Sequence, residues 1–151
     1  MEDLTQGGYV LTADPKRVDF TRVHRWLSEE SYWAVGRSYD LVARSIDGSL
    51  PYSIFAGAEQ MGFARAVTDG ATFAWICDVF IDGTHRGRGL GKWLIDSILA
   101  DLSERGVQRF LLATRDAQEV YRRSGFAELE GAHRFMEIDR RPTRNLIFGR
   151  A

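Results

Sequence analysis

The spacing of apolar and polar residues in the first fifty positions predicts one short strand and two helices. An apolar run over residues 9–12 has the length of a strand, and the proline at position 15 favours a turn directly after it. Asp19 can cap a helix whose apolar residues recur on one face. A second helical stretch follows and ends at Asp47-Gly48.

From residue 51 onward the spacing becomes that of strands. Residues 52–56 and 61–67 predict a hairpin, and residues 73–81 predict a third strand that is apolar along almost its whole length. Such a strand is typical of the centre of a sheet, where both faces are buried. Asp78 is the exception within it.

The last third of the chain alternates between helix and strand. A long amphipathic helix begins at Leu90 and ends at Gly106, and a strand is predicted over residues 109–114. Helices therefore come first, then an antiparallel meander, then strand, helix and strand in turn. This order indicates an α/β or α+β fold rather than a barrel or a helical bundle.

The predicted elements after residue 114 are short. Asp116 and Glu119 have the spacing of a capping box at the start of a short helix. Residues 126–129 and 135–138 predict a closing hairpin, and residues from about 140 to 151 form a basic tail. The arginines expected to be solvated in this tail are Arg140, Arg141, Arg144 and Arg150.

Length and composition fit one domain over residues 1–151. The chain is 44% hydrophobic and 27% charged, with a formal charge of -1, so no general attraction to nucleic acid is expected. The single cysteine, Cys77, cannot form an intrachain disulfide, and it lacks the partners of a nucleophile or of a metal site. No apolar signal segment and no stretch of ~18 apolar residues is present, so we expect a cytoplasmic protein without membrane contact.

The most informative segment is the glycine-rich turn over residues 81–92, which joins an apolar strand to the long helix. The first N–H groups of a helix have no partners within it, and the helix dipole places partial positive charge beside them. Arg86, Arg88 and Lys92 add formal charge. The turn therefore predicts binding of a phosphate group.

Two familiar phosphate-binding motifs do not fit this turn. A Walker loop requires glycine at the position of Arg86 and serine or threonine at that of Trp93. The dinucleotide fingerprint requires glycine or alanine where the chain has Lys92 or Leu94. The Walker loop therefore fails at two positions, and the dinucleotide fingerprint fails at one position in each of its two possible alignments.

The motif that does fit is Arg-Gly-Arg-Gly-Leu-Gly over residues 86–91, and with it the chain resembles the GNAT superfamily of acetyl-CoA-dependent N-acetyltransferases. The strand over residues 78–81 is similar to the central strand of that family. The segment from Tyr121 to Gly125-Phe126 is similar to its Tyr-x-x-x-Gly-Phe ending. The resemblance implies a mixed, mostly antiparallel sheet with helices on both faces, opened between the strands that contain Val79 and Leu112.

The resemblance also implies roles for individual residues. Asp116 stands beside the pantetheine arm of acetyl-CoA, where the family often has asparagine, and Tyr121 protonates the departing thiolate of coenzyme A. Backbone groups of the central strand bind the pantetheine arm, and N–H groups of the turn bind the pyrophosphate. These residues are Val79, Phe80 and Ile81 in the strand and Arg86, Gly87, Arg88, Gly89, Leu90 and Gly91 in the turn.

A general base is harder to assign. Some family members have a glutamate on the central strand, and this chain has Trp75 there. Asp78 is one candidate base; the alternative is a buried carboxylate tied to a neighbouring helix or to backbone N–H groups. Asp78 shares a face with Trp75 only if a bulge intervenes. Without a strong base, the favoured acceptor should be an amine with a pKa near ~8, such as an α-amine.

The predicted reaction is direct transfer of an acetyl group from acetyl-CoA to a primary amine of a small molecule or peptide, without a metal. Tyr32, Trp33 and Arg37 lie between the two predicted helices, where the family binds its acceptor, although the aromatic residues could equally belong to the core. Two alternatives are a non-catalytic acyl-CoA sensor and, less well supported by the spacing, a nucleotide-binding enzyme. Similar proteins often form homodimers, so a homodimer is possible; the acceptor itself cannot be identified from the sequence.

Overall fold

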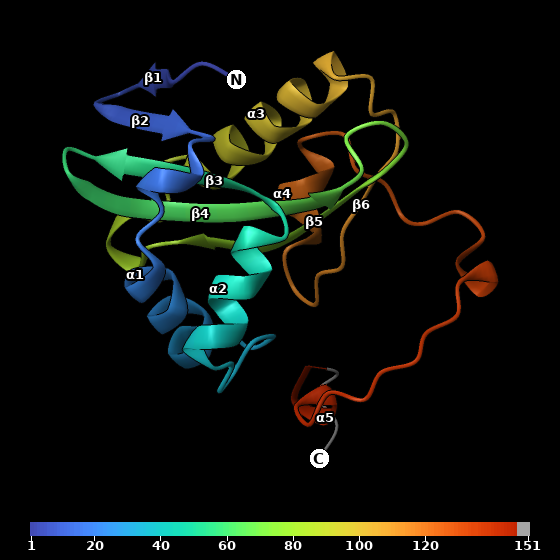
Figure 1. Ribbon diagram of the computed structural model, residues 1–151. Coiled ribbons are helices and arrows are strands. Elements are labelled where there is room, and N and C mark those ends of the chain that lie inside the picture. The colour runs from blue at the N-terminus through green and yellow to red at the C-terminus, as the bar shows by residue number, and fades with distance from the viewer. Residues whose placement is uncertain (148–151) are drawn as a thin grey trace.

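The computed structural model describes residues 1–147 and shows one six-stranded sheet with helices on both faces (Figure 1). The strands lie in chain order, and each pairs antiparallel with the next except β5 and β6, which are parallel. The strands are β1 (Leu4–Gln6), β2 (Tyr9–Thr12), β3 (Leu50–Ala56), β4 (Glu59–Thr68), β5 (Ala74–Ile81) and β6 (Phe110–Leu111). The α-helices are α1 (Phe20–Arg25), α2 (Tyr39–Asp47), α3 (Leu90–Glu104), α4 (Gln118–Arg122) and α5 (Arg144–Ile147).

Four short helical turns complete the described elements. They are η1 (Pro15–Arg17), η2 (Trp26–Glu30, a π-helical turn), η3 (Gly83–His85) and η4 (Ala132–Arg134). The predicted strands of the meander and the predicted long helix are confirmed, and β1 is an additional strand that the sequence did not predict. No helix in the described part of the chain is long and apolar enough to cross a membrane.

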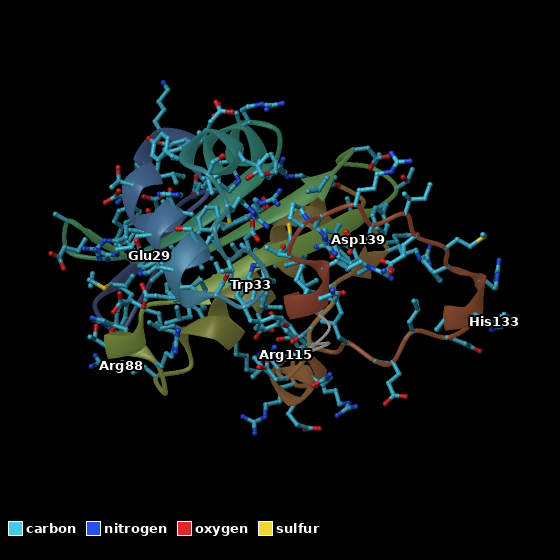
Figure 2. The ribbon with its side chains drawn as sticks, turned by 90° about the horizontal axis from the view of Figure 1, so that it is seen from below. Glu29, Trp33, Arg88, Arg115, His133 and Asp139 are labelled. Atoms are coloured by element: carbon cyan, nitrogen blue, oxygen red, sulfur yellow. The ribbon has the colours of Figure 1, made fainter. Side chains whose placement is uncertain are left out.

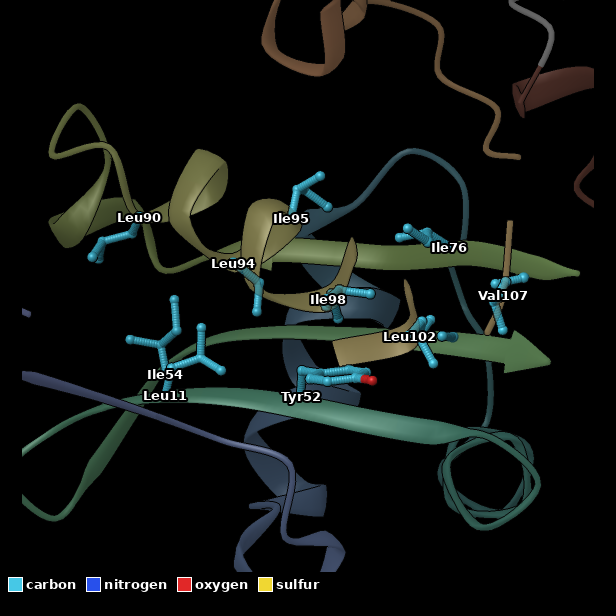
Figure 3. Close-up of a cluster of buried hydrophobic side chains, with 13 residues drawn as sticks. Leu11, Tyr52, Ile54, Ile76, Leu90, Leu94, Ile95, Ile98, Leu102 and Val107 are labelled. Carbon is cyan, nitrogen blue, oxygen red and sulfur yellow. The ribbon is translucent and has the colours of Figure 1, made fainter. Parts of the chain in front are cut away.

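Two hydrophobic layers hold the sheet between its helices. On one face, α3 packs against the strands through a cluster that Figure 3 shows in close-up. On the other face, α1, η2 and α2 cover a second cluster that includes the fully buried Trp26 and Phe63. Full burial of one such side chain stabilises the fold by about 1.5–3 kcal/mol. Both faces of the central strands are therefore anchored, which fixes the position of the edge where β5 and β6 meet.

A β-bulge in β5 changes which layer its residues face. The register with β4 shifts between Phe63 and Arg65, and Asp78 on the opposing strand has a φ of 53°. Before the bulge, Ile76 packs in the α3 layer; after it, Phe80 packs in the opposite layer and stacks on Trp26. The extra residue of a bulge produces such a reversal. Asp78 thereby points to the layer of α1 and η2.

Local capping explains where the first two helices begin. The side chain of Asp19 accepts a hydrogen bond from the Arg22 N–H at 2.9 Å, as the sequence predicted. Ser38 caps α2 in the same way, through the Leu41 N–H at 3.2 Å. The helix α3 has no side-chain cap, since its N-cap is Gly89 in the left-handed region.

The sequence-based predictions are least accurate after residue 109. The strand predicted over 109–114 pairs with β5 only at Phe110 and Leu111, and the closing hairpin predicted over 126–129 and 135–138 is not formed. The expected capping box is also wrong: the N-cap of α4 is Ala117, and no side-chain hydrogen bond caps this helix. A strand forms only beside a partner strand, and the spacing of residues within one segment does not show whether such a partner is present.

The basic tail is more ordered than expected. Arg141 is ion-paired with Asp139 at 2.6 Å, and α5 follows it. Arg144 lies 3.8 Å from Glu137. Arg140, Arg141 and Arg144 are all exposed, as expected of a solvated tail, although Arg141 and Arg144 also form ion pairs; Arg150 lies outside the described residues.

Candidate functional site

The strands β5 and β6 separate after two residue pairs and enclose a cleft of about 820 Å³. This volume is within the usual range for a small-molecule site. The walls are formed by β5, by the segment between β6 and α4, and by the segment between η2 and α2. The sequence predicted this opening between strands containing Val79 and Leu112; Val79 lines the cleft, whereas Leu112 follows the end of β6 and lines a separate cavity.

The glycine-rich turn presents unpaired backbone donors at the start of α3. Within the described part of the chain, the N–H groups from Arg86 to Lys92 donate to no protein acceptor, whereas the Trp93 N–H bonds to Gly89. Gly87 and Gly89 have φ values of 75° and 76°, and this left-handed backbone turns the donors toward the helix start. The arrangement fits an anionic group such as a diphosphate.

The charged side chains of this turn are partly occupied with neighbours. Arg86 donates to the Ile81 carbonyl at 3.0 Å, and Arg88 donates to the Tyr9 hydroxyl at 3.0 Å. In Figure 2 Arg88 lies at the opposite end of the molecule from His133. The arginines therefore position the turn as well as adding positive charge to it.

Three polar side chains converge on Asp78. Its carboxylate accepts hydrogen bonds from Trp33 Nε1 at 2.9 Å, from Arg37 Nη1 at 2.8 Å and from Arg65 Nε at 2.7 Å. Only 2% of the Asp78 side chain is exposed. The bulge in β5 therefore places this carboxylate inside a cluster of donors at the floor of the cleft.

The electrostatics of this cluster favour the charged carboxylate. Burial alone would raise the pKa of Asp78, but the guanidinium groups of Arg65 and Arg37 and the hydrogen bonds outweigh burial and hold that pKa below its usual range. A carboxylate stabilised in this way is a weak base. The geometry favours the alternative of a buried carboxylate tied to its neighbours.

Tyr121 lines the cleft, as Tyr32 does, and also lines a second cavity beside β6. It extends from α4, and its ring packs edge-on against Phe126 at 6.0 Å. Burial, with smaller contributions from Tyr32 and Asp116, raises the pKa of Tyr121 to about 12. The hydroxyl is therefore protonated at neutral pH and available as a donor. Asp116 is itself exposed and lies at the rim of the cleft.

The predicted acceptor residues Tyr32, Trp33 and Arg37 all line the cleft. Tyr32 also joins two walls of the cleft through Arg115. The Tyr32 hydroxyl accepts a hydrogen bond from the Arg115 backbone N–H at 2.8 Å, and the Arg115 guanidinium lies 3.8 Å from the centroid of the Tyr32 ring. In Figure 2 Trp33 lies on the blue N-terminal part of the ribbon and Arg115 on the orange part that follows β6.

The cleft also contains residues that the sequence did not indicate. Arg65 is hidden within an apolar strand, and only the strand register reveals that it faces Asp78. Glu137 and Arg141 line the cleft from the tail. Cys77 lines it as well, and burial raises the pKa of its thiol to about 11, which keeps it neutral at neutral pH.

Of the predicted strand contacts, Val79 lines the cleft and Phe80 is buried in the core, so that Phe80 offers only its backbone. The pairing of β5 with β6 stops at Trp75, and the edge of β5 from Cys77 onward faces the cleft. An extended ligand could therefore lie beside this edge.

Comparison with known proteins agrees with this geometry. Residues 20–126 match the acetyltransferase (GNAT) family, which extends the similarity into the first two helices. The chain is 27% identical to a protein of the fungus Gibberella zeae that bears the name of an acetyltransferase, over 80% of this chain and 79% of that one.

Solved structures share the fold. A crystal structure of a GNAT-family protein from Xanthomonas campestris is 38% identical, with a TM-score of 0.84 over 89% of this chain and 95% of that one. A Mycobacterium tuberculosis protein solved in complex with CoA has a TM-score of 0.65 over 80% of this chain and 73% of that one; at 17% identity it supports the fold alone. The family match over most of the chain, together with the Xanthomonas relative, leads to one conclusion: the chain belongs to the GNAT family of acetyltransferases.

Proposed function

We propose that this acetyltransferase uses acetyl-CoA and transfers its acetyl group to a primary amine of a small molecule or peptide. The observation that carries the proposal is the set of unpaired N–H groups at the start of α3, at one end of the free edge of β5. Tyr121 faces the same cleft. A diphosphate at the turn and a thioester near Val79 would account for both features.

When bound, acetyl-CoA supplies an activated acetyl group as a thioester. The N–H groups from Arg86 to Gly91 hold its pyrophosphate, and the edge of β5 holds its pantetheine arm. The backbone N–H of Val79 is the donor that we assign to the developing oxyanion, a contribution of about 3 kcal/mol. Alignment of the two reactants in the cleft supplies a further ~7–11 kcal/mol.

Tyr121 acts on the leaving group. Because its pKa is about 12, the phenol is protonated at neutral pH and donates to the sulfur as the thioester bond breaks. The neutral Cys77 thiol takes no part, so transfer is direct and forms no acyl-enzyme.

The acceptor must supply a neutral amine without help from a strong base, since Asp78 is held as a charged carboxylate by Arg37 and Arg65. Deprotonation of an amine with a pKa of ~10.4 would then cost about 4 kcal/mol near neutral pH, whereas deprotonation of an amine with a pKa near ~8 would cost about 1 kcal/mol. We therefore propose that the favoured acceptors are α-amines or other amines of modest pKa.

Release of coenzyme A from acetyl-CoA, measured against a panel of amines of graded pKa, tests the proposal. We expect release that depends on the amine and is fastest for amines of low pKa. A clear preference for lysine-like amines would contradict the assignment of Asp78. Tight binding of acetyl-CoA with no release by any amine would favour the non-catalytic sensor instead.

A further inference from the structure

The cleft between β5 and β6 has more positive than negative side chains along its walls. The charged residues that line it are Arg37, Arg65, Arg115, Arg141, Asp78, Asp116 and Glu137. Away from the floor, these charges are paired one to one. Asp116 lies 3.8 Å from Arg115, and Glu137 lies 3.8 Å from Arg144. Arg141 is paired in turn with Asp139, outside the lining.

The surplus positive charge therefore lies at the floor of the cleft. There a single carboxylate, that of Asp78, is shared by the guanidinium groups of Arg37 and Arg65. Asp78 uses only a small part of their donor capacity, because each guanidinium has five N–H donors. Arg37 gives one to Asp78 through Nη1 at 2.8 Å, and Arg65 gives one through Nε at 2.7 Å. Among residues 1–147, neither guanidinium forms another hydrogen bond to the protein.

The remaining donors can be reached from the cleft. Both arginines line it, and the side chains of Arg37 and Arg65 are 18% and 13% exposed. In the described part of the chain, only Ser124 Oγ is a fully buried side-chain polar atom without a partner. Every unpaired nitrogen of the two guanidinium groups therefore keeps contact with solvent, and its acceptor is water or a ligand.

The two guanidinium groups are also held in place without a ligand. Arg65 extends from β4 and Arg37 from the segment before α2, and both end on the carboxylate that Trp33 holds from its other oxygen. Donors fixed in this way lose little conformational freedom when a ligand binds. Asp78 directly precedes Val79, whose N–H we assigned to the oxyanion. A group bound by these arginines therefore lies close to the site assigned to the thioester.

A carboxylate fits this pair of arginines better than a phosphate does. The planar fork of a guanidinium matches the two oxygens of a carboxylate. The surplus at the floor is one positive charge, which a carboxylate balances, whereas a phosphate monoester has a charge of about −1.5 to −2 near neutral pH. Nearby positive charge also disfavours the ammonium form of an amine and so lowers its pKa. That effect assists an acceptor in a cleft whose own carboxylate is a weak base.

We propose, on the basis of the acetyl transfer proposed above, that the acceptor carries a carboxylate as well as its amine, and that Arg37 and Arg65 bind this carboxylate at the floor of the cleft. The acceptors are then amino acids or short peptides with a free C-terminus. The two arginines determine specificity and neither forms nor breaks a bond. Asp78 acts as the anchor that keeps their guanidinium groups together.

Matched acceptors test this specificity. A panel of dipeptides is compared with the same dipeptides as C-terminal carboxamides, which keep an α-amine with a pKa near ~8 and lose only the carboxylate. We expect kcat/KM to be at least about tenfold higher for the carboxylates, chiefly through a lower KM, since hydrogen bonds to a charged group contribute that much. Equal kcat/KM within the pairs would overturn this inference and leave acetyl transfer standing. Faster transfer to aminoalkyl phosphates than to the carboxylates would overturn it as well.

Substitution of Arg37 tests which residue reads the carboxylate. In Arg37→Gln the ratio of kcat/KM between carboxylate and carboxamide should fall toward one. Arg37→Lys keeps a charge opposite Asp78 but lacks the fork, so it should restore only part of the ratio. Arg44→Gln, on α2 with a side chain that is 74% exposed, is the control and should keep the wild-type ratio. The ratio compares two substrates on one preparation, so a partly unfolded variant does not alter it. A wild-type ratio in Arg37→Gln would overturn the assignment.

Binding measured without reaction separates this inference from the proposed function. Coenzyme A lacks an acetyl group, so calorimetric titration of a dipeptide into the coenzyme A complex reports affinity alone. Dipeptides should bind at least about tenfold more tightly than their carboxamides, and Arg37→Gln should abolish the difference. If no amine is acetylated but this difference is found, the carboxylate site stands and the proposed function fails. Equal affinities, or no measurable binding at millimolar concentrations, would overturn the inference.

The same titration distinguishes the two sources of the carboxylate. Alanine is compared with alaninamide, as each dipeptide is with its carboxamide. A larger loss of affinity in the alanine pair would identify a free amino acid as the acceptor, and a larger loss in the dipeptide pairs would identify a short peptide. Either result supports binding of a carboxylate by Arg37 and Arg65, whereas no loss in any pair would contradict it.

Discussion

Replacing Asp78→Asn keeps the shape of the side chain and removes the charge that Arg37 and Arg65 share. Asparagine tolerates the left-handed backbone of this position, where φ is 53°, so strain is not introduced. Its amide group cannot accept from all three donors, and its N–H₂ would face a guanidinium group. The variant therefore removes the charge together with part of the hydrogen bonding to the three donors.

The magnitude follows from burial. Breaking a buried ion pair by removing one partner costs about 3–5 kcal/mol. Arg65 and Arg37 are 13% and 18% exposed, so water solvates part of their charge and the lower value applies. A loss of about 3 kcal/mol in the free energy of unfolding corresponds to a fall in Tm of roughly 6–12 °C for a chain of this size.

The effect should also depend on pH. The pKa of Asp78 is lower in the folded state than in the unfolded chain. Its contribution is therefore fully present above the unfolded value near ~4, and it is lost as the pH falls through the folded value. The Asn variant has no such contribution to lose. The difference in stability between the two proteins should narrow below about pH 4.

Urea unfolding near neutral pH and at about pH 3 measures both effects. Asp40→Asn is the control, because its side chain is 80% exposed beside Arg44 and its loss should cost less than about 0.5 kcal/mol. If the free energy of unfolding of Asp78→Asn lies within about 1 kcal/mol of the wild-type value at neutral pH, Asp78 does not stabilise the buried charges of Arg37 and Arg65. A difference in unfolding free energy that stays constant as the pH is lowered would refute the conclusion that folding lowers the pKa of Asp78.

Three further substitutions test other parts of the structure. Tyr121→Phe should lower kcat at least ~100-fold and change the affinity for acetyl-CoA little; an unchanged kcat would remove the phenol from the reaction. Gly62→Ala should destabilise by about 1–3 kcal/mol in urea unfolding, because the added Cβ would lie 2.9 Å from Ile81 Cδ1 and 3.3 Å from Ile54 Cβ, which is fixed to its backbone. Tyr52→Phe should cost about 1–3 kcal/mol, since it removes the 2.7 Å hydrogen bond to the buried Asp101; acetyl transfer by the folded protein should be unaffected.

The sequence was informative where a local pattern determines local structure. The strands of the meander, the helix after Leu90 and the cap at Asp19 all follow from residue spacing or from a side chain and the N–H groups beside it. The glycine-rich turn at the start of α3 was also predictable, because glycines, charges and a helix start lie next to one another in the chain. These features need no information about distant residues.

The rest depended on register between segments far apart in the chain. From the sequence, a bulge in β5 could be named only as the condition under which Asp78 would share a face with Trp75. The position of Arg65 beside Asp78 follows from that bulge. Residues 126–129 and 135–138 have the composition of a hairpin, yet each would need a hydrogen-bonding partner that the fold does not place beside it. Apolar alternation indicates that a segment can be a strand; it does not identify the neighbour.

The reversal of faces in β5 restricts how the length of this chain can vary. Deleting one residue between Ile76 and the glycine-rich turn would rotate Phe80 away from Trp26 and toward α3, and would send Val79 in the opposite direction. Insertions should be harmless in the loop that joins β4 to β5, which lies in solvent. In the second half of β5, inserting or deleting one residue would move each following side chain from one hydrophobic layer to the other.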